Sequence, residues 1–159
     1  MWRSGVVAGL AAGIVLPGLV FAQADIQNNY NGAYLEGRSF AKQNLKQAKF
    51  YKANLRGVDF SGSDLRGASL FAASLRGANF NKARLDDAEL SNADLQGAKL
   101  DQAVLAGAYM TAARLKGVSV DGTDFTDTII NNQQKTYLCG RATGTNALTK
   151  RQTRRTLSC

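Results

Sequence analysis

Large apolar residues recur at every fifth position through most of this chain. The series starts at Leu35 and ends at Ile130, and all twenty of its positions hold Leu, Phe, Met, Val or Ile. A small residue, most often Ala, stands two positions before most of them. A period of five matches neither the 3.6-residue period of a helix nor the two-residue period of a strand. Such regularity indicates an internal repeat.

The spacing favours a coil with short straight sides and frequent corners. In an extended segment, residues i−2 and i point to the same side, so each Ala-x-Leu turns a small and a large side chain inward together. The next two residues must turn the chain, and nine times the second of them is Gly, which readily adopts positive φ. An α-helix would scatter the apolar residues around its axis, since it rotates by about 100° per residue.

One set of glycines sets the size of the coil. Its members are 20 residues apart: Gly37, Gly57, Gly77, Gly97 and Gly117. Four five-residue units per coil would stack them in one column. We therefore expect an all-β solenoid of about five square coils, each about 4.8 Å above the last.

The first 24 residues have the layout of a secretory signal. One charge, Arg3, precedes an apolar run that ends in Ala22-Gln23-Ala24. We predict cleavage after Ala24, which leaves an exported chain that begins at Asp25. The alternative is an uncleaved anchor, because Ser4–Ala22 approaches the length that spans a bilayer. A proline and several glycines in this segment favour cleavage. The predicted organisation is then a signal peptide (1–24), an N-terminal lead-in (25–32), the repeat coil (33–132) and a C-terminal cap (133–159).

The two cysteines, Cys139 and Cys159, both lie in this last segment. An even pair in an exported chain is most simply a disulfide, which here would close a loop of about 20 residues. Free thiols and a metal site are the alternatives. The chain contains no His, which removes a common metal ligand.

The repeat units resemble those of a known family. The stretches "ANLRGVDF", "SDLRGASL" and "ADLQGAKL" are similar to the motif of pentapeptide-repeat proteins. The resemblance implies a right-handed quadrilateral β-helix in which the central Leu or Phe and the preceding Ala are buried. Arg38 and Gln43 depart from this pattern, since they stand where a small buried residue belongs. We therefore expect the first coil to be distorted or to act as a cap.

The tail carries a second resemblance, to the ends of exported pentapeptide-repeat proteins of cyanobacteria and of plant thylakoid lumens. It rests on Leu138-Cys139, Ala142, Gly144, Asn146, Thr149, Thr153-Arg154 and Leu157-x-Cys159. The resemblance implies a thylakoid-lumen or periplasmic location and a pairing of the two cysteines. Ser158 departs from the Gly expected before the last Cys.

The end of a solenoid needs a cover for its open core and strand edges, so we expect the tail to provide it. Thr149 and Gln152 fit a capping box, which predicts a short helix over Lys150–Leu157. A second helix is expected over Lys135–Ala142. The apolar residues available to cover the last coil are Tyr137, Leu138 and Leu157.

Charge is distributed unevenly along the chain. The formal net charge is +8, and it becomes +7 once Arg3 leaves with the signal. Residues 37–58 and the segment after Asp127 each contain six basic residues and no acid, whereas the middle is slightly acidic. Basic ends favour anionic partners.

No catalytic arrangement is evident. Without His, a Ser-His-Asp or Cys-His arrangement is impossible. The densest carboxylate group, Asp86-Asp87-Glu89, is expected to be a solvated corner rather than a metal or acid/base site. We expect no enzymatic activity and no cofactor.

Two outward columns are the candidate binding surface. Tyr51 and Phe71 stack in one, with Lys49 and Lys52 beside them. The other holds Arg56, Arg76, Gln96 and Lys116. The alternative is that the aromatic column only stabilises neighbouring strands and that the long basic side chains extend into water.

These features favour a non-enzymatic scaffold of the thylakoid lumen or periplasm. It would bind an unknown protein or an anionic membrane surface through its flat faces, and nucleic acid is not expected. The alternative is a DNA-mimicking topoisomerase inhibitor or protector, as some cytoplasmic pentapeptide-repeat proteins are. Mimicry requires a negative rod, so the positive charge and the export signal argue against it.

Overall fold

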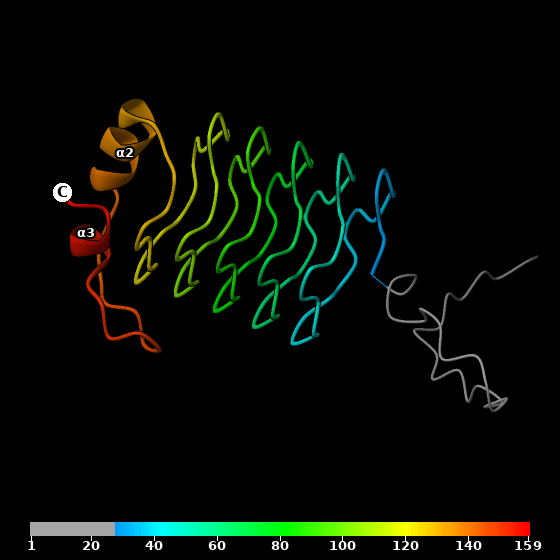
Figure 1. Ribbon diagram of the computed structural model, residues 1–159, viewed down its shortest axis with the longest axis horizontal. Coiled ribbons are helices and arrows are strands. Elements are labelled where there is room, and N and C mark those ends of the chain that lie inside the picture. The colour runs from blue at the N-terminus through cyan, green and yellow to red at the C-terminus, as the bar shows by residue number, and fades with distance from the viewer. Residues whose placement is uncertain (1–27) are drawn as a thin grey trace, which may run out of the picture.

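The computed structural model describes residues 28–159, and the chain there forms a coil that turns every five residues (Figure 1). Parallel β-bridges join each bridging residue to the one 20 positions further on, from Asn29↔Lys49 to Tyr109↔Ile129. Each side of the coil contributes a single bridge residue, so residues 28–159 contain no longer strand. The register of 20 gives four units per coil.

The core is built from the predicted inward positions. Every central residue from Phe40 to Phe125 is buried, as is every residue two positions before a centre from Ala48 to Thr123. Burial of a Leu or Phe side chain contributes roughly 1.5–3 kcal/mol, so the stacked centres supply the main stabilisation of the coil.

Aromatic rings stack where the register places them above one another. The ring centroids of Phe40 and Phe60 lie 5.5 Å apart, and those of Phe60 and Phe80 lie 5.2 Å apart, with interplanar angles below 20°. Tyr30 stacks on Phe50 in the same way, at 4.8 Å. Offset-stacked rings at such distances add to the gain from burial.

The coil begins one unit earlier than predicted. Asn29 bridges Lys49, and the Tyr30 and Gly32 N–H groups donate to the next coil at 2.7 and 2.8 Å. Residues 29–32 therefore belong to the coil, and their assignment to a lead-in is wrong.

The first coil is also not distorted. Its bridges follow the same register of 20 as the rest. The side chains of Arg38 and Gln43 are exposed. The backbone repeat therefore tolerates these two large residues at positions that later coils give to small buried ones.

The second corner residue has positive φ in every unit from Gly32 to Asp127. Ten of these positions hold Gly, and the other ten hold residues such as Lys42, Ala72 and Asn92. The left-handed conformation costs an L-residue roughly 1–2 kcal/mol. Half of the corners therefore carry backbone strain that the packing of the coil offsets.

After the last bridge the chain forms two helices, α2 (Asn132–Cys139) and α3 (Thr153–Thr156). A capping box starts α2: the Asn131 side chain accepts from the Gln134 N–H at 2.8 Å, and the Gln134 side chain accepts from the Asn131 N–H at 3.0 Å. This helix begins three residues before the predicted start.

The predicted helix over 150–157 is shorter than expected. Only the four residues of α3 are helical, and its N-cap, Gln152, makes no side-chain capping bond. The capping box predicted at Thr149 and Gln152 is therefore wrong. Residue Gln152 instead forms an antiparallel bridge with Thr145, which holds the segment before α3 extended.

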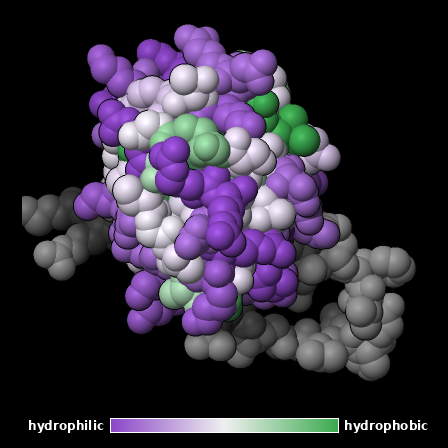
Figure 2. All heavy atoms as spheres, turned by 90° about the vertical axis from the view of Figure 1, so that its left-hand side faces the viewer, coloured by the Kyte–Doolittle hydropathy of each residue, from purple (hydrophilic) through white to green (hydrophobic). Residues whose placement is uncertain are grey.

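The C-terminal segment packs on the last coil. Leu138 and Leu157 are buried in the same core cluster as the coil centres, and Tyr137 packs against it. Cys139 and Cys159 are joined by a disulfide with their Cα atoms 5.7 Å apart. Ser158, where a Gly was expected, has φ +53°. Figure 2 shows that the outer face of this end is largely hydrophilic.

Side chains of the segment also satisfy backbone groups at the edge of the last coil. The Gly117 N–H donates to the Tyr137 hydroxyl at 2.7 Å, and the Phe125 N–H donates to the Thr156 hydroxyl at 3.1 Å. Asn146 and Gln134 donate to edge carbonyls. An unpaired strand edge can pair with another chain. These contacts lower the number of unpaired backbone groups at this edge.

Candidate interaction surface

The predicted aromatic pair lies at one corner of the coil. We call residues 51–52, 71–72, 91–92 and 111–112 the aromatic corner. The rings of Tyr51 and Phe71 stack with centroids 5.8 Å apart and an interplanar angle of 14°. Lys52 Nζ lies 5.0 Å from the centre of the Tyr51 ring, a cation–π contact. Three of the sequence-predicted residues are thus in contact.

The two rings are not equally accessible. Tyr51 is 42% exposed, whereas Phe71 is only partly exposed. Both residues stand at outward corner positions, and the Phe71 ring is the more covered of the two. Lys49 is exposed and bridges Ser69 on the side that precedes this corner.

Charge is sparse at the aromatic corner. Its eight positions are Tyr51, Lys52, Phe71, Ala72, Ser91, Asn92, Thr111 and Ala112, of which only Lys52 is charged. The other corners hold several charged residues each. Protein interfaces are enriched in aromatic residues and depleted in charge at their centres. This corner has that composition.

The second predicted column forms what we call the basic corner, which holds Arg56, Arg76, Gln96 and Lys116. It is not an unbroken row of free positive charge. Arg56 lies 3.9 Å from the Glu36 carboxylate. Arg76 lies 3.3 Å from the Asp94 carboxylate and donates to Gln96 at 2.8 Å.

Lys116 alone of the three predicted cations at this corner makes no ion pair within residues 28–159. Exposed pairs of this kind contribute at most about 1 kcal/mol, but they lower the positive potential of the ridge. The basic corner is therefore a weaker anion-binding surface than the sequence indicated.

Carboxylates elsewhere on the coil are engaged by neighbouring arginines. Arg66 makes two hydrogen bonds to Asp64, at 2.8 and 2.6 Å, and this lowers the pKa of Asp64 to about 2. In the predicted solvated group, Asp86 pairs with Arg84 at 2.8 Å. No group of three or more acidic or Cys residues in the described part of the chain is placed to hold a metal ion.

One carboxylate is fully buried where the C-terminal segment meets the coil. Burial alone would raise the pKa of Asp124. The Thr126 hydroxyl and N–H, which donate to it at 2.6 and 2.9 Å, and the Arg151 charge at 3.6 Å outweigh that effect and lower the pKa. The pair Asp124–Arg151 thus couples the last coil to the tail.

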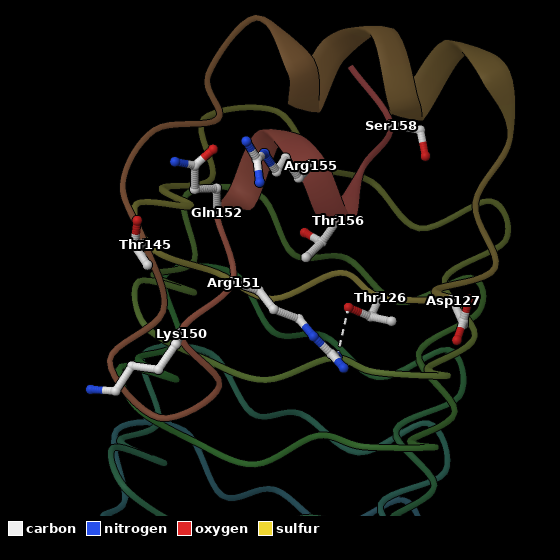
Figure 3. A pocket seen from close by; sticks show the side chains of 9 residues that line it. All are labelled: Thr126, Asp127, Thr145, Lys150, Arg151, Gln152, Arg155, Thr156 and Ser158. Carbon is white, nitrogen blue, oxygen red and sulfur yellow. Dashed lines mark hydrogen bonds between the residues drawn. The ribbon is translucent and has the colours of Figure 1, made fainter.

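A hollow of about 510 Å³ lies beside this pair (Figure 3). Three basic residues line it: Lys150, Arg151 and Arg155. Figure 3 shows that they do not converge, because Arg151 points to Thr126 while Lys150 and Arg155 point elsewhere. This arrangement does not form a focused anion site.

A second hollow of about 400 Å³ lies between α2 and the last coil. The sequence does not predict this hollow, because it depends on how the tail folds over the coil. Tyr137 and Gln134 border this hollow. From the sequence, Tyr137 is recognisable only as an apolar residue and Gln134 only as a helix-capping residue.

The predicted cleavage residues Ala22 and Ala24 lie outside the described residues, so the predicted signal cleavage stays a prediction. None of the helices found within residues 28–159 has the length and apolar character needed to cross a bilayer.

The coil and its repeat define the class of protein. The family model described as pentapeptide repeats matches in eight copies, over residues 31–67, 68–105 and 88–127. The chain therefore belongs to the pentapeptide-repeat family, whose members fold as right-handed quadrilateral β-helices. No curated protein matches the sequence.

The chain is also similar to solved structures. A pentapeptide repeat protein from the Arabidopsis thaliana thylakoid lumen is 37% identical, with a TM-score of 0.79, over 90% of this chain and 97% of that chain. Rfr23 from the cyanobacterium Cyanothece 51142 is 28% identical over 65% of this chain and 64% of that chain, with a TM-score of 0.36.

Proposed function

We propose that this protein is an exported, non-enzymatic interaction module that binds a partner protein through the aromatic corner. The observation that carries the proposal is the exposed stack of Tyr51 on Phe71, with Lys52 over the Tyr51 ring, at a corner that otherwise lacks charge. Aromatic anchors of this kind supply much of the binding energy in protein interfaces.

Substitution of both rings tests the proposal. A tagged protein with Tyr51→Ala and Phe71→Ala should lose a partner that copurifies with the parent from the native cell. The matched control replaces two other exposed apolar residues, Tyr34→Ala and Leu148→Ala, and should retain the partner. Unchanged recovery with the first variant would exclude the aromatic corner as the contact.

We further propose export to a thylakoid lumen or periplasm. Support comes from the secretory layout of residues 1–24, the disulfide and the similarity to a thylakoid-lumen protein. The mature protein purified from the cell should begin at Asp25. Retention of Met1 on that protein would contradict the proposal.

An anionic membrane surface is a weaker candidate partner, because two of the arginines at the basic corner are paired with carboxylates. A flotation assay with vesicles that contain an anionic lipid tests whether the protein binds such a surface. The DNA-mimic alternative is disfavoured by the net charge of +8, since mimicry requires a negative surface.

We also propose that the coil has about five turns and that residues 133–159 act as its cap. The buried Leu138 and Leu157 and the side-chain bonds to edge backbone groups support this role. A cap would prevent edge-to-edge association of the last coil.

A further inference from the structure

The groove between α2 and the last coil is lined by backbone groups as well as side chains. The last coil contributes Ala112, Leu115 and Lys116 to its lining, and α2 contributes Gln133, Gln134 and Tyr137. It lies on the side of the coil where another unit would follow if the repeat continued. The chain instead leaves this side through α2.

The coil side of the groove presents open N–H donors. Within the coil, central and corner N–H groups donate to carbonyls of the following coil, as from Leu95 to Arg114 at 3.0 Å and from Asn92 to Thr111 at 2.9 Å. The equivalent N–H groups one coil later belong to Leu115 and Ala112. Neither has a hydrogen-bond acceptor among residues 28–159.

The acceptors of the same edge are already occupied. Gln134 Nε2 donates to the Met110 and Ala113 carbonyls, both at 2.9 Å. The Gly117 N–H, next along the edge, is taken by the Tyr137 hydroxyl. The groove thus offers free backbone donors, whereas the Met110 and Ala113 carbonyls beside them are occupied. This arrangement favours a ligand rich in carbonyl or carboxylate oxygen.

The side-chain charge of the groove also favours a ligand with carboxylate groups. Lys116 lines the groove and makes no ion pair with any residue in the range 28–159. The lining contains no carboxylate. Its remaining walls include Ala113, Leu115 and Tyr137, which give the groove apolar surface for a small side chain.

We propose that this groove binds a short extended acidic segment of a partner protein. Carbonyl oxygens of the segment accept from the Ala112 and Leu115 N–H groups, and its carboxylate pairs with Lys116. The groove adjoins the last residues of the aromatic corner at Ala112, but it lies two coils beyond Phe71 and does not depend on the Tyr51 and Phe71 rings.

The test is a titration of the ¹⁵N-labelled protein, expressed with its own leader and purified after export. The probe is the capped tetrapeptide acetyl-AEVE-amide, and its basic counterpart acetyl-AKVK-amide is the control. Amide resonances of Ala112 and Leu115 should shift with the acidic peptide alone. Lys116→Glu should weaken binding about fivefold or more.

Two variants control for charge and access. Lys99→Glu makes the same charge change at an exposed lysine away from the groove and should leave the affinity within about twofold of the parent. Gln133→Trp fills the groove from the exposed side of α2 and should abolish the shifts, whereas Gln133→Ala should not.

Absence of shifts at Ala112 and Leu115, equal binding of the basic peptide, or equal weakening by Lys99→Glu would each overturn the proposal. Copurification of a partner through Tyr51 and Phe71 would survive those results, because it is measured at the other surface. The two proposals therefore fail separately.

Discussion

Asn146 offers a sharp test of how the tail holds the last coil. Its side chain is fully buried. Its Nδ2 donates to the Gln102 and Ala103 carbonyls, both at 3.2 Å, and to the Gly122 carbonyl at 2.8 Å. One amide group thus bonds to carbonyls of two successive coils.

The amide oxygen of Asn146 organises the tail itself. It accepts from the Leu148 and Thr149 N–H groups, both at 3.0 Å. Asn146→Ala removes both sets of bonds and leaves buried groups without partners. A buried group left unsatisfied costs about 1–3 kcal/mol, so we expect the free energy of unfolding to fall by about 3 kcal/mol.

Asn146→Asp separates the two halves of this interaction. The introduced carboxylate keeps the acceptor for Leu148 and Thr149 but faces three carbonyl oxygens, which raises its pKa in the folded state. A raised pKa means that stability is retained below the ordinary value near 4 and is lost as the pH rises through the raised value. This variant should therefore be more destabilised at pH 7 than at pH 4.

Urea unfolding followed by circular dichroism measures these differences with the disulfide intact. Since repeat proteins do not always unfold in two states, hydrogen exchange of the Gly122 amide provides a local measure. An unfolding free energy of Asn146→Ala within about 0.5 kcal/mol of the parent would contradict this role of Asn146. So would an Asn146→Asp variant that loses no more stability at pH 7 than at pH 4.

Three further predictions concern the corners, the charges and the disulfide. Gly77 has φ +66°, and a Cβ added there would meet no other atom. Gly77→Ala should therefore lower the free energy of unfolding in urea by about 1 kcal/mol through backbone strain alone. Ala72, at φ +55°, provides the reverse test: Ala72→Gly should raise the free energy of unfolding by a similar or smaller amount. Because the Arg66 hydrogen bonds lower the pKa of Asp64 to about 2 from 3.8, its contribution to stability is present above pH 3.8 and lost as the pH falls toward 2; Asp64→Asn should therefore flatten the acid loss of stability over that range. Replacement of Cys139 and Cys159 by Ser should lower the unfolding free energy by about 3 kcal/mol, and mass spectrometry of the unreduced parent after alkylation should show no modified cysteine.

The repeat could be predicted from the sequence because each five-residue unit makes the same contacts. The glycine column set the register of 20, and the inward positions followed from the pleat. The start was missed because the unit at Tyr30 has a polar residue, Asn28, two positions before its centre. An end coil has a neighbour on one side only within the described chain, so its small inward position is less constrained than those further along.

The ion pairs of the basic corner were not predictable from columns alone. Glu36 shares the column of Arg56, but Asp94 reaches Arg76 from an adjacent column. Such diagonal contacts depend on side-chain conformations that the period does not encode. The stacked pair of Tyr51 and Phe71 was predictable, because two aromatic residues 20 apart must lie above one another.

The tail could be predicted only in outline. Its helices and disulfide have local signals, including the Asn131–Gln134 capping box. Two hydrogen bonds, from the Asn146 side chain to the Gly122 carbonyl and from the Gly117 N–H to the Tyr137 hydroxyl, join residues at least 20 positions apart outside the repeat. These contacts are set by how the tail folds across the last coil, and they also create the groove beside α2.

Photocrosslinking in the native cell tests whether the aromatic corner contacts a partner protein. A benzophenone amino acid placed at position 51, on the aromatic corner, should yield a discrete crosslinked product with a partner protein. The same group at position 34, where Tyr34 is 87% exposed, should not yield that product. Absence of a product from position 51, or the same product from both positions, would contradict the assignment of the aromatic corner as the partner-binding surface.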